Sequence, residues 1–534
     1  RRLGRGRGES CSVHRLDSQR VEELDLSRQL LLGVDIGSTR MKAGLFDTEG
    51  REVVLRHVEY PILHPVQLAG EHDARNWLIS FKTLVHSVLK APYVTAADIA
   101  AISVDCLCPS LIPVTRNNAP LMNSIFFMDR RSMDEANLME EKIGTKKFFS
   151  IAGNRIAHSA FSAPIMLWIK RKHPKVFDET FKFLHGNGFI ERYLTGQFSM
   201  DWTNASFTLL FETRNRRQWS SRLLDELGIT VDKLPELKAP WDVVGEVTQE
   251  ASRETGLARG TPVIAGGADT ACAALGVGAV ENGEAMEDGG TATKLAVVTD
   301  KPDFPIKTLN RCHVVPDRWL LVAASSTTGA LLRWLKDLLG TYEGEAKRRG
   351  VDVYTLMDKD AAKSPPGANG VIVLPYFAPG GERSPIWDPY ARGVIFGLTL
   401  ASGRQDVVRA VLEASAYALR DNITMIESHG IKIGTVRLSG GQASSRLWRG
   451  IKADVTRKPV ALTSRVEATV FGTALLGGYG AGLYSDLGST AKELGRVREI
   501  RRPRLAGAHR YRENFDAFKD AYERLRPRFE ELYS

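Results

Sequence analysis

The fold is decided by the stretch Leu30-Leu-Leu-Gly-Val-Asp35-Ile-Gly-Ser-Thr-Arg-Met-Lys-Ala-Gly-Leu-Phe46. Apolar residues fill both ends of this stretch, whereas its middle is polar and contains a glycine. This pattern predicts two strands joined by a tight turn at residues 37–39. A strand over 53–60, a helix over 76–89 and an apolar strand over 99–104 are expected next. Strands that alternate with helices predict an α/β domain with a mixed sheet.

A second hairpin of the same outline is expected in the other half of the chain. Residues 283–288 and 294–298 have strand character and flank a turn at 289–291. The pattern Asp-x-Gly-[Ser/Thr] of residues 35–38 recurs at 288–291, and a lysine follows each copy. Two similar turns favour a pseudo-symmetric pair that faces one nucleotide, but a match this short is as compatible with coincidence as with duplication.

Three further segments complete the expected organisation. The apolar run 261–265 ends in a Gly-Gly pair and leads into a helix. It is interpreted as the opening of the second cycle of strands and helices. Residues 436–448 predict a strand, a glycine turn and a helix capped by Ser444 or Ser445. Helices are also expected over 467–482 and, as an amphipathic structural element, over 511–532.

Length and charge restrict the class of protein. A chain of 534 residues exceeds one hydrophobic core and predicts two large domains. Part of the net charge of +9 comes from arginines near the two ends, and no basic motif with interspersed aromatic residues accompanies it. The sequence therefore predicts no nucleic-acid partner.

The expected location is the cytoplasm. Five scattered cysteines are an odd number and predict reduced thiols. The most apolar stretch, 263–280, carries Asp269 in its middle, so no membrane segment is expected. Residues 1–28 lack the apolar core of a secretory signal and are predicted to form a disordered extension.

Five landmarks in order make the chain resemble the FGGY family of carbohydrate kinases, within the actin-like ATPase superfamily. They are Gly33-Val-Asp35-Ile-Gly37-Ser38-Thr39, Met128-Asp129-Arg130-Arg131, Ala163-Pro164 with Trp168, Gly266-Gly267-Ala-Asp269, and Gly440-Gly441-Gln442. One glycine turn alone would be weak evidence, but the ordered set is specific. The resemblance covers about residues 30 to 505.

The resemblance implies an α/β fold with two actin-like, RNase-H-like ATPase domains and a cleft between them. Residues 29–276 would form the N-terminal domain, 277–505 the C-terminal domain with the nucleotide site, and 506–534 a terminal helix. It also implies ATP and Mg²⁺ as cofactors and transfer of the γ-phosphoryl group to a sugar hydroxyl. Phosphoryl transfer needs positioning, charge neutralisation and an acceptor for the hydroxyl proton.

Two aspartates are assigned to the chemistry. Asp269 stands where an apolar strand gives way to a helix, whose positive end would keep its carboxylate ionised, so it is predicted to be the general base and to contact the sugar. Without the resemblance, a simple helix cap would be the preferred interpretation. Asp35 is predicted to lie on the Mg²⁺ side, through water, because Mg²⁺ is held by one or two carboxylates together with waters and phosphates.

The remaining site residues follow from the resemblance. Asp129 is expected to accept sugar hydroxyls, with Arg131 orienting it, and Asp105 and Cys108 to line the rim of the sugar site. Nucleotide contacts are expected from two phosphate turns, one further glycine and an adenosine turn: Gly37, Ser38, Thr39, Gly290, Thr291, Gly329, Gly441, Gln442 and Ser445.

The exact sugar is left open by departures from the family pattern. Cys108-Pro109 replaces the Met-His pair of xylulokinases, whereas Asp105-Cys-Leu-Cys108 resembles ribulokinase-type members. Ala292 follows Thr291 where many relatives have serine, and Ile165 stands where they have lysine. A ketopentose such as xylulose is favoured, with ribulose, another polyol or an aldonate as alternatives. A non-catalytic actin-like ATP-binding regulator or chaperone is the alternative class, and a homodimer is one option for the assembly.

Overall fold

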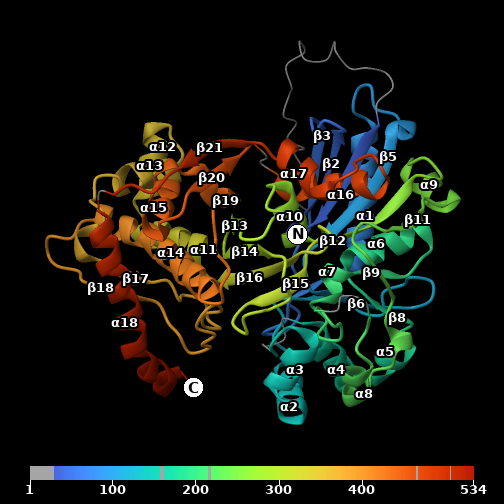
Figure 1. Ribbon diagram of the computed structural model, residues 1–534, viewed down its shortest axis with the longest axis horizontal. Coiled ribbons are helices and arrows are strands. Elements are labelled where there is room, and N and C mark those ends of the chain that lie inside the picture. The colour runs from blue at the N-terminus through green and yellow to red at the C-terminus, as the bar shows by residue number, and fades with distance from the viewer. Residues whose placement is uncertain (1–28, 157–160, 215–217, 465–466, 506, 534) are drawn as a thin grey trace, which may run out of the picture.

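The computed structural model describes residues 29–156, 161–214, 218–464, 467–505 and 507–533. Two halves lie side by side, each built on one large mixed sheet (Figure 1). The predicted disordered extension, residues 1–28, lies outside the described residues. No helix in the described ranges has the length and apolarity needed to cross a membrane.

The first large sheet carries the hairpin quoted above. Its strands lie in the order β3-β2-β1-β5-β12-β11. Their bounds are β1 Leu30–Ile36, β2 Arg40–Asp47, β3 Glu52–Glu59, β5 Ile99–Cys106, β11 Val243–Glu246 and β12 Pro262–Ala268. All residues of β1 are buried, because neighbouring strands and helices cover it on every side. β1 pairs antiparallel with β2 and parallel with β5, which sets Asp35 beside Asp105.

The second large sheet repeats this pattern. Its order is β16-β14-β13-β19-β20-β21, with β15 added outside β16. The bounds are β13 Ala285–Gly289, β14 Thr293–Thr299, β15 Leu309–Cys312, β16 Trp319–Ser325, β19 Val436–Ser439, β20 Val460–Thr463 and β21 Val497–Arg501. Read in these orders, each sheet has two antiparallel pairs, then two parallel pairs, then one antiparallel pair.

The two hairpins match in register. Asp35 pairs with Lys42 in the first hairpin, and Asp288 pairs with Lys294 in the second. The shared strand order favours duplication over coincidence as the origin of the repeated motif. The run at 261–265 does not open the second cycle, however, because β12 pairs with β5 and belongs to the first sheet.

The boundary between the halves differs from the expected one. Helices α16 (Ala468–Gly480) and α17 (Leu487–Leu494) come late in the chain but lie in the first half, beside α10 (Asp269–Gly276) (Figure 1). The range 277–505 is therefore not one compact domain. The physical reason is that β1 and α10 bury one face each, and α16 supplies the apolar cover for both.

Glycines allow α16 to approach unusually closely. A Cβ atom on Gly472 would lie 1.9 Å from the carbonyl oxygen of Cys272, and one on Gly276 would lie 1.9 Å from that of Ala468. A Cβ on Gly33 of β1 would lie 2.3 Å from the carbonyl oxygen of Val470. Backbone meets backbone at these points, so only glycine fits.

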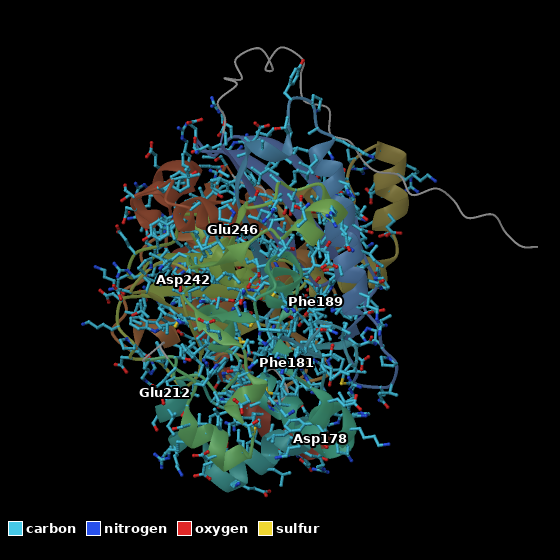
Figure 2. The ribbon with its side chains drawn as sticks, turned by 90° about the vertical axis from the view of Figure 1, so that its right-hand side faces the viewer. Asp178, Phe181, Phe189, Glu212, Asp242 and Glu246 are labelled. Carbon is cyan, nitrogen blue, oxygen red and sulfur yellow. The ribbon has the colours of Figure 1, made fainter. Side chains whose placement is uncertain are left out.

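Some of the remaining elements of the first half, such as α1 and α6, pack on its large sheet, and others extend away from it (Figure 2). Glu246 ends β11, whereas Phe181 and Asp178 belong to the far part, which holds a small sheet of order β4-β7-β6-β8. The bounds are α1 Ala74–Leu89, α2 Met133–Ile143, α3 Thr145–Ala152, α4 Ser162–Lys172, α5 Pro174–Glu179, α6 Gly186–Thr195, α7 Trp202–Ala205, α8 Ser221–Leu227, α9 Gln249–Thr255, β4 Glu71–His72, β6 Ser110–Val114, β7 Ser124–Phe126, β8 Lys182–Leu184, β9 Ser199–Asp201 and β10 Glu236–Lys238.

The second half has its own helical cover. Its helices are α11 Thr328–Leu339, α12 Tyr342–Arg349, α13 Val353–Ala361, α14 Arg404–Glu427, α15 Arg446–Thr456 and α18 Ala508–Tyr533, with a short pair of strands, β17 Ile372–Leu374 and β18 Val394–Phe396. The terminal helix α18 buries Tyr511, Phe515 and Phe518 against this layer. The expected amphipathic terminal helix is thus confirmed as a structural element.

Candidate active site

Asp269 is the first residue of α10, immediately after β12. Its side chain is 27% exposed, although its neighbours in β12 and α10 are buried. Oδ1 accepts hydrogen bonds from the Thr270 backbone N–H, at 2.6 Å, and from the Thr270 hydroxyl, at 3.0 Å. The carboxylate is therefore held at the positive end of a helix with one face open to solvent.

Lys294 links this carboxylate to the second half. Its Nζ lies 3.2 Å from Asp269 Oδ2 and 3.8 Å from Asp288 Oδ2. Burial alone would raise the pKa of Asp269, but Lys294 and Arg311 outweigh it and hold that pKa below its usual value. Asp269 is consequently ionised at neutral pH, as an acceptor for a hydroxyl proton must be.

Asp35 ends the first hairpin strand beside a second lysine. Its Oδ2 lies 3.7 Å from Lys42 Nζ, which also contacts Glu467 at 2.5 Å. Burial raises the pKa of Asp35 to about 6, against the opposing effect of Lys42, and the charge of Asp269 adds to the rise. The negative charges of Asp35 and Asp269 thus repel each other.

Asp105 lies deeper than the sugar rim on which it was expected. It is fully buried, and its Oδ2 accepts a hydrogen bond from the Thr473 hydroxyl of α16. Burial and the neighbouring Asp35 raise the pKa of Asp105 well above its usual value. Burial and Asp35 therefore favour the neutral form of Asp105, and its contact with a sugar stays a prediction.

The acidic residues suit a cation held mainly by phosphates. Among the described residues no group of three or more His, Cys, Asp or Glu side chains could hold a metal by itself. Mg²⁺ needs only one or two carboxylates in a nucleotide complex, and the close pair Asp35 and Asp269 offers them. A divalent cation would also relieve their mutual repulsion, so the donor set fits Mg²⁺.

Both predicted phosphate turns lie at hairpin ends. Thr39, Gly290 and Thr291 are exposed, whereas Gly37 and Ser38 are partly buried. The Gly37 N–H donates to the Arg40 carbonyl at 3.0 Å, and the Gly290 N–H donates to the Ala292 carbonyl at 3.0 Å. In each turn a glycine N–H therefore donates to a carbonyl farther along the same turn, three residues on in the first turn and two residues on in the second.

Gly329 supports the second turn from the start of α11. A Cβ atom on Gly329 would lie 2.1 Å from the Gly290 carbonyl oxygen, so only glycine allows this approach. Sequence reasoning predicted a nucleotide contact here, and the structure shows why the position needs glycine.

We expect Gly329→Ala to lower kcat/KM for ATP by about 10- to 100-fold, because a displacement of about 1 Å in a positioning group can have that effect. The measurement is steady-state kinetics with ATP varied. Gly344→Ala in α12 is the matched control, since a Cβ there would meet only the end of the Arg348 side chain, at 3.6 Å. Equal ATP kinetics for both variants would show that the Gly290 turn is not a phosphate site.

Gln442 was expected to contact adenosine. In the structure its side chain makes hydrogen bonds to other residues of the protein. Its side chain is buried and donates to the Gly290 carbonyl at 3.0 Å and to the Thr328 hydroxyl at 2.9 Å. Its Oε1 accepts from Lys452 Nζ at 2.9 Å, and Lys452 is ion-paired with Glu287 at 2.7 Å. Gln442 therefore fastens the phosphate turn to the second sheet.

Ser445 and Gly441 flank the predicted adenosine turn. The Ser445 hydroxyl accepts from the Trp448 N–H at 3.0 Å and caps α15, as one of the two expected serines. Gly441 is exposed, with open space where a side chain would be. A flat base could approach the backbone there.

Asp129 and Arg131 form the expected pair. Arg131 Nε donates to Asp129 Oδ2 at 2.9 Å, and Arg131 Nη2 contacts Glu71 Oε1 at 2.6 Å. The Gly70 N–H also donates to Asp129, at 2.9 Å, and the guanidinium of Arg131 lies over the ring of Trp168. The Arg131–Asp129 pair is observed, whereas the orienting role of Arg131 and the contact of Asp129 with a sugar stay predictions.

Cys108 lies partly exposed at the end of the loop after β5. Its sulfur is 4.0 Å from His185 Nδ1. Burial is the largest influence on the thiol and raises the pKa of Cys108 far above its usual value. Cys108 is therefore a neutral, weakly polar side chain, which suits a rim position.

Sequence reasoning missed several residues of this site. Lys294 and Lys42 were noticed only as parts of a repeat, although their register opposite an aspartate could have indicated ion pairs. Glu467 and Thr473 reach the site because α16 returns to the first half, and no local pattern predicts that return. Arg311, on β15, has no sequence signal.

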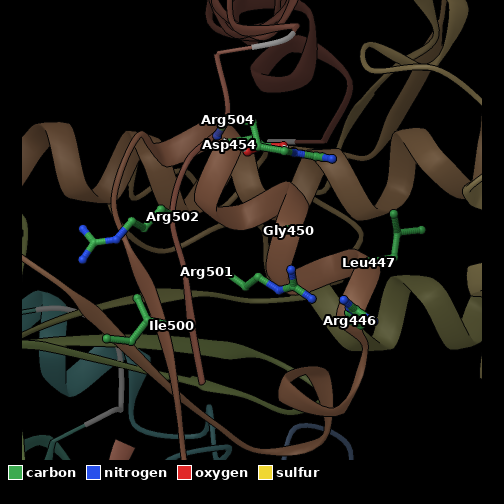
Figure 3. A pocket seen from close by; sticks show the side chains of 8 residues that line it. All are labelled: Arg446, Leu447, Gly450, Asp454, Ile500, Arg501, Arg502 and Arg504. Atoms are coloured by element: carbon green, nitrogen blue, oxygen red, sulfur yellow. Dashed lines mark hydrogen bonds and ion pairs between the residues drawn. The ribbon is translucent and has the colours of Figure 1, made fainter. Parts of the chain in front are cut away.

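Two hollows adjoin the predicted nucleotide residues. One of about 400 Å³ lies beside Thr39 and Tyr60. The other, of about 660 Å³, begins at Arg446, directly after Ser445, and runs along α15 (Figure 3). Its Arg504 is paired with Asp454 at 2.7 Å, and its Arg501 with Glu499 at 2.6 Å, so much of its positive charge is neutralised.

Comparison with known proteins agrees with this geometry. Residues 30–276 match the family model described as "FGGY family of carbohydrate kinases, N-terminal domain", and residues 289–481 match the corresponding C-terminal domain. The chain is 27% identical over 495 residues to a xylulose kinase of Bacillus subtilis, covering 92% of this chain and 96% of the relative. It is also 27% identical over 469 residues to a gluconokinase of the same organism, covering 87% and 90%.

A solved structure has the same architecture. The xylulose kinase from Rhodospirillum rubrum superposes with a TM-score of 0.85 at 27% identity, covering 94% of this chain and all of that one. The α/β fold with two domains is therefore confirmed over nearly the whole chain. Relatives with different sugars are about equally similar, so the comparison leaves the sugar undecided.

Proposed function

The chain belongs to the FGGY family of carbohydrate kinases and is an ATP-dependent sugar kinase, and from this premise we propose that Asp269 accepts the proton of the sugar hydroxyl that is phosphorylated. The observation that supports this proposal is the position of Asp269. It is an ionised, partly exposed carboxylate at the start of α10, with one predicted phosphate turn near it in each half.

In the proposed reaction the sugar oxygen attacks the γ-phosphorus, and the bond from that phosphorus to the bridging oxygen of ADP breaks. The hydroxyl proton passes to the Asp269 carboxylate. The low pKa of Asp269 makes it a weak base, which suffices because the transition state of phosphoryl transfer is loose and proton transfer need not run far ahead of it. Mg²⁺, when bound, would neutralise charge on the phosphates, with Asp35 as its protein-side partner.

The lysines prepare the site for anionic phosphates. Lys294 contacts both Asp269 and Asp288, and Lys42 contacts Asp35 and Glu467. Each hairpin therefore places one cation beside its turn, where it can interact with phosphate oxygens. The backbone N–H groups of the turns at 37–39 and 290–291 complete this arrangement as proposed phosphate contacts.

The acceptor class is proposed on two grounds that point in different directions. Resemblance to xylulose kinases favours a ketopentose such as xylulose, with Asp129 and Cys108 as rim residues. A buried arginine beside Asp269, considered in the next subsection, favours an aldonate. The four described cysteines are free, which supports the expected reducing, cytoplasmic environment.

The reaction is tested by a substrate screen. We expect ATP consumption by the purified chain to depend on added sugar, with the best ketopentose or aldonate at least about tenfold above glycerol in kcat/KM, because unmatched polar groups penalise a shorter polyol. A coupled ADP assay over D- and L-ketopentoses, aldonates, pentitols, erythritol and glycerol measures it. ATP consumption that ignores every sugar would support the non-catalytic regulator instead.

A further inference from the structure

Arg311 is a buried cation that has no anionic partner among the residues the structure describes. It lies on β15 and is 3% exposed. Its Nε and Nη1 atoms are buried without a hydrogen-bond acceptor, and none of the ion pairs among the described residues includes it. Its guanidinium lies 3.7 Å from the ring centre of Phe207. An arginine this deeply buried is ordinarily paired with a carboxylate or phosphate.

The backbone around Arg311 is firmly fixed. The N–H of the preceding residue, Asn310, donates to Asn154 Oδ1 at 2.7 Å. The N–H of the following residue, Cys312, donates to the Ser206 hydroxyl at 3.1 Å. Both partners belong to the first half, so β15 of the second half carries Arg311 against the first half. The position of the guanidinium is therefore set by the fold and not by a flexible surface.

Arg311 lies near the place predicted for the sugar, because helix α7 contacts both β15, which carries Arg311, and β12, which ends directly before Asp269. Its charge acts on three groups: it lowers the pKa of Asp269 and of Cys108, and it lowers that of His185, in each case after the larger influence of burial. Asp269 is the proposed base, and Cys108 is the proposed rim residue. Arg311 therefore lies within the electrostatic reach of both ends of the proposed sugar site.

Nothing in the described site requires this extra charge. Asp269 already has Lys294 at 3.2 Å and two hydrogen bonds from Thr270. Cys108 stays protonated, and His185 is held neutral because burial lowers its pKa to about 4. An uncompensated buried charge costs several kcal/mol, so a site that keeps one is prepared for a charged ligand.

Two further buried arginines lie within electrostatic reach of each other. Arg130 follows the proposed sugar ligand Asp129, and Arg383 comes from the second half. Burial is the main influence that lowers the pKa of both, and the positive charge of Arg383 lowers that of Arg130 further. An anion between the two halves would relieve this unfavourable arrangement.

We propose that the acceptor is a sugar acid, an aldonate-type polyhydroxy carboxylate, and that Arg311 binds its carboxylate while Asp269 receives the proton of its reacting hydroxyl. This inference rests on the proposed kinase function. A carboxylate is preferred to a second phosphate because a single guanidinium balances one negative charge, and because guanidinium and carboxylate match in shape. Arg311 is then the residue that gives the site its preference for acidic over neutral sugars.

The test compares acidic and neutral acceptors of equal length on the full chain. We measure kcat/KM for gluconate and xylonate against the neutral sorbitol, xylitol and xylulose, and include sorbitol 6-phosphate, which has a phosphate but no carboxylate, to distinguish the two anions. An acid is expected to exceed its neutral counterpart by more than tenfold. In Arg311→Gln the ratio of acid to neutral kcat/KM is expected to fall by about 100-fold, mainly through the KM for the acid.

Two variants complete the design. Arg311→Lys keeps the charge but loses the planar fork, so it should retain part of the preference and carries the comparison should Arg311→Gln not fold. The matched control is Arg222→Gln, at an exposed position of α8. It should leave the ratio of acid to neutral kcat/KM unchanged. Melting temperatures of all variants are measured together with the kinetics.

Each outcome decides between the interpretations. Robust turnover of a neutral ketopentose with no preference for acids overturns the sugar-acid inference and leaves the kinase function intact. An equal loss on acidic and neutral sugars in Arg311→Gln assigns Arg311 to structure and also overturns it. Preference for the phosphorylated sugar assigns the guanidinium to a phosphate and corrects the ligand. ATP consumption with neither class overturns the kinase function, and this inference with it.

Discussion

Asp269→Asn is expected to lower kcat by about 10²- to 10⁴-fold while leaving ATP affinity nearly unchanged. That loss is typical of removing a positioned proton acceptor. Asparagine keeps the size of the side chain and can still accept from Thr270, so the start of α10 should persist. The variant nevertheless loses the carboxylate that Lys294 and Arg311 keep ionised. Turnover and nucleotide binding are measured on the same preparation.

A matched variant separates chemistry from general damage. Asp300→Asn lies on the exposed surface of the second half and should retain wild-type kcat. If Asp269→Asn also retained wild-type turnover, Asp269 would have no part in the mechanism. If it lost ATP affinity as strongly as turnover, its role would be to organise the phosphate site through Lys294.

Asp35→Asn is expected to raise the Mg²⁺ concentration needed for half-maximal activity by more than tenfold and to lower kcat at any fixed Mg²⁺. The substitution removes the hairpin carboxylate proposed to face the metal, yet it preserves the shape of the strand end. The measurement is a titration of activity with Mg²⁺ at saturating ATP. Glu49→Gln, exposed at the other end of the same hairpin, is the control.

The pKa of Asp35 adds a second expectation. Because that pKa is raised to about 6, protons compete with the cation as the pH falls through this value. The wild-type requirement for Mg²⁺ should therefore rise between pH 7 and pH 5.5, whereas that of Asp35→Asn should hardly change with pH. An unchanged Mg²⁺ requirement in the variant, or the same pH dependence in both proteins, would exclude Asp35 from the metal site.

Local sequence patterns predicted the strands that carry the site. The first hairpin was expected at 30–46 and is observed as β1 and β2, because alternating apolar residues and a glycine turn specify it without help from distant segments. The apolar run 261–265 was interpreted from its local pattern as the opening of the second cycle, although the family resemblance placed it in the N-terminal domain, to whose sheet it belongs. Its pairing with β5 depends on contacts far apart in sequence, which periodicity cannot reveal.

The sequence predicted the positions of those site residues that lie at the start of a helix or the end of a strand. Asp269 precedes a helix and Asp35 ends a strand, so their places follow from the elements. The buried surroundings of Gln442 could not be predicted, because they depend on the packing of three segments around it. Arg311 could not be found at all, since its meaning comes from the absence of a described partner and not from its neighbours in the sequence.

The return of α16 to the first half also constrains how the chain is made. On the ribosome, β1 and α10 emerge long before residues 468–480, so the face that α16 covers must wait for almost the entire chain. Until then the close-packed glycines at 33 and 276 face no partner. The first half can therefore reach its final packing only near the end of translation, and it is during this interval that a nascent chain would most need protection from aggregation.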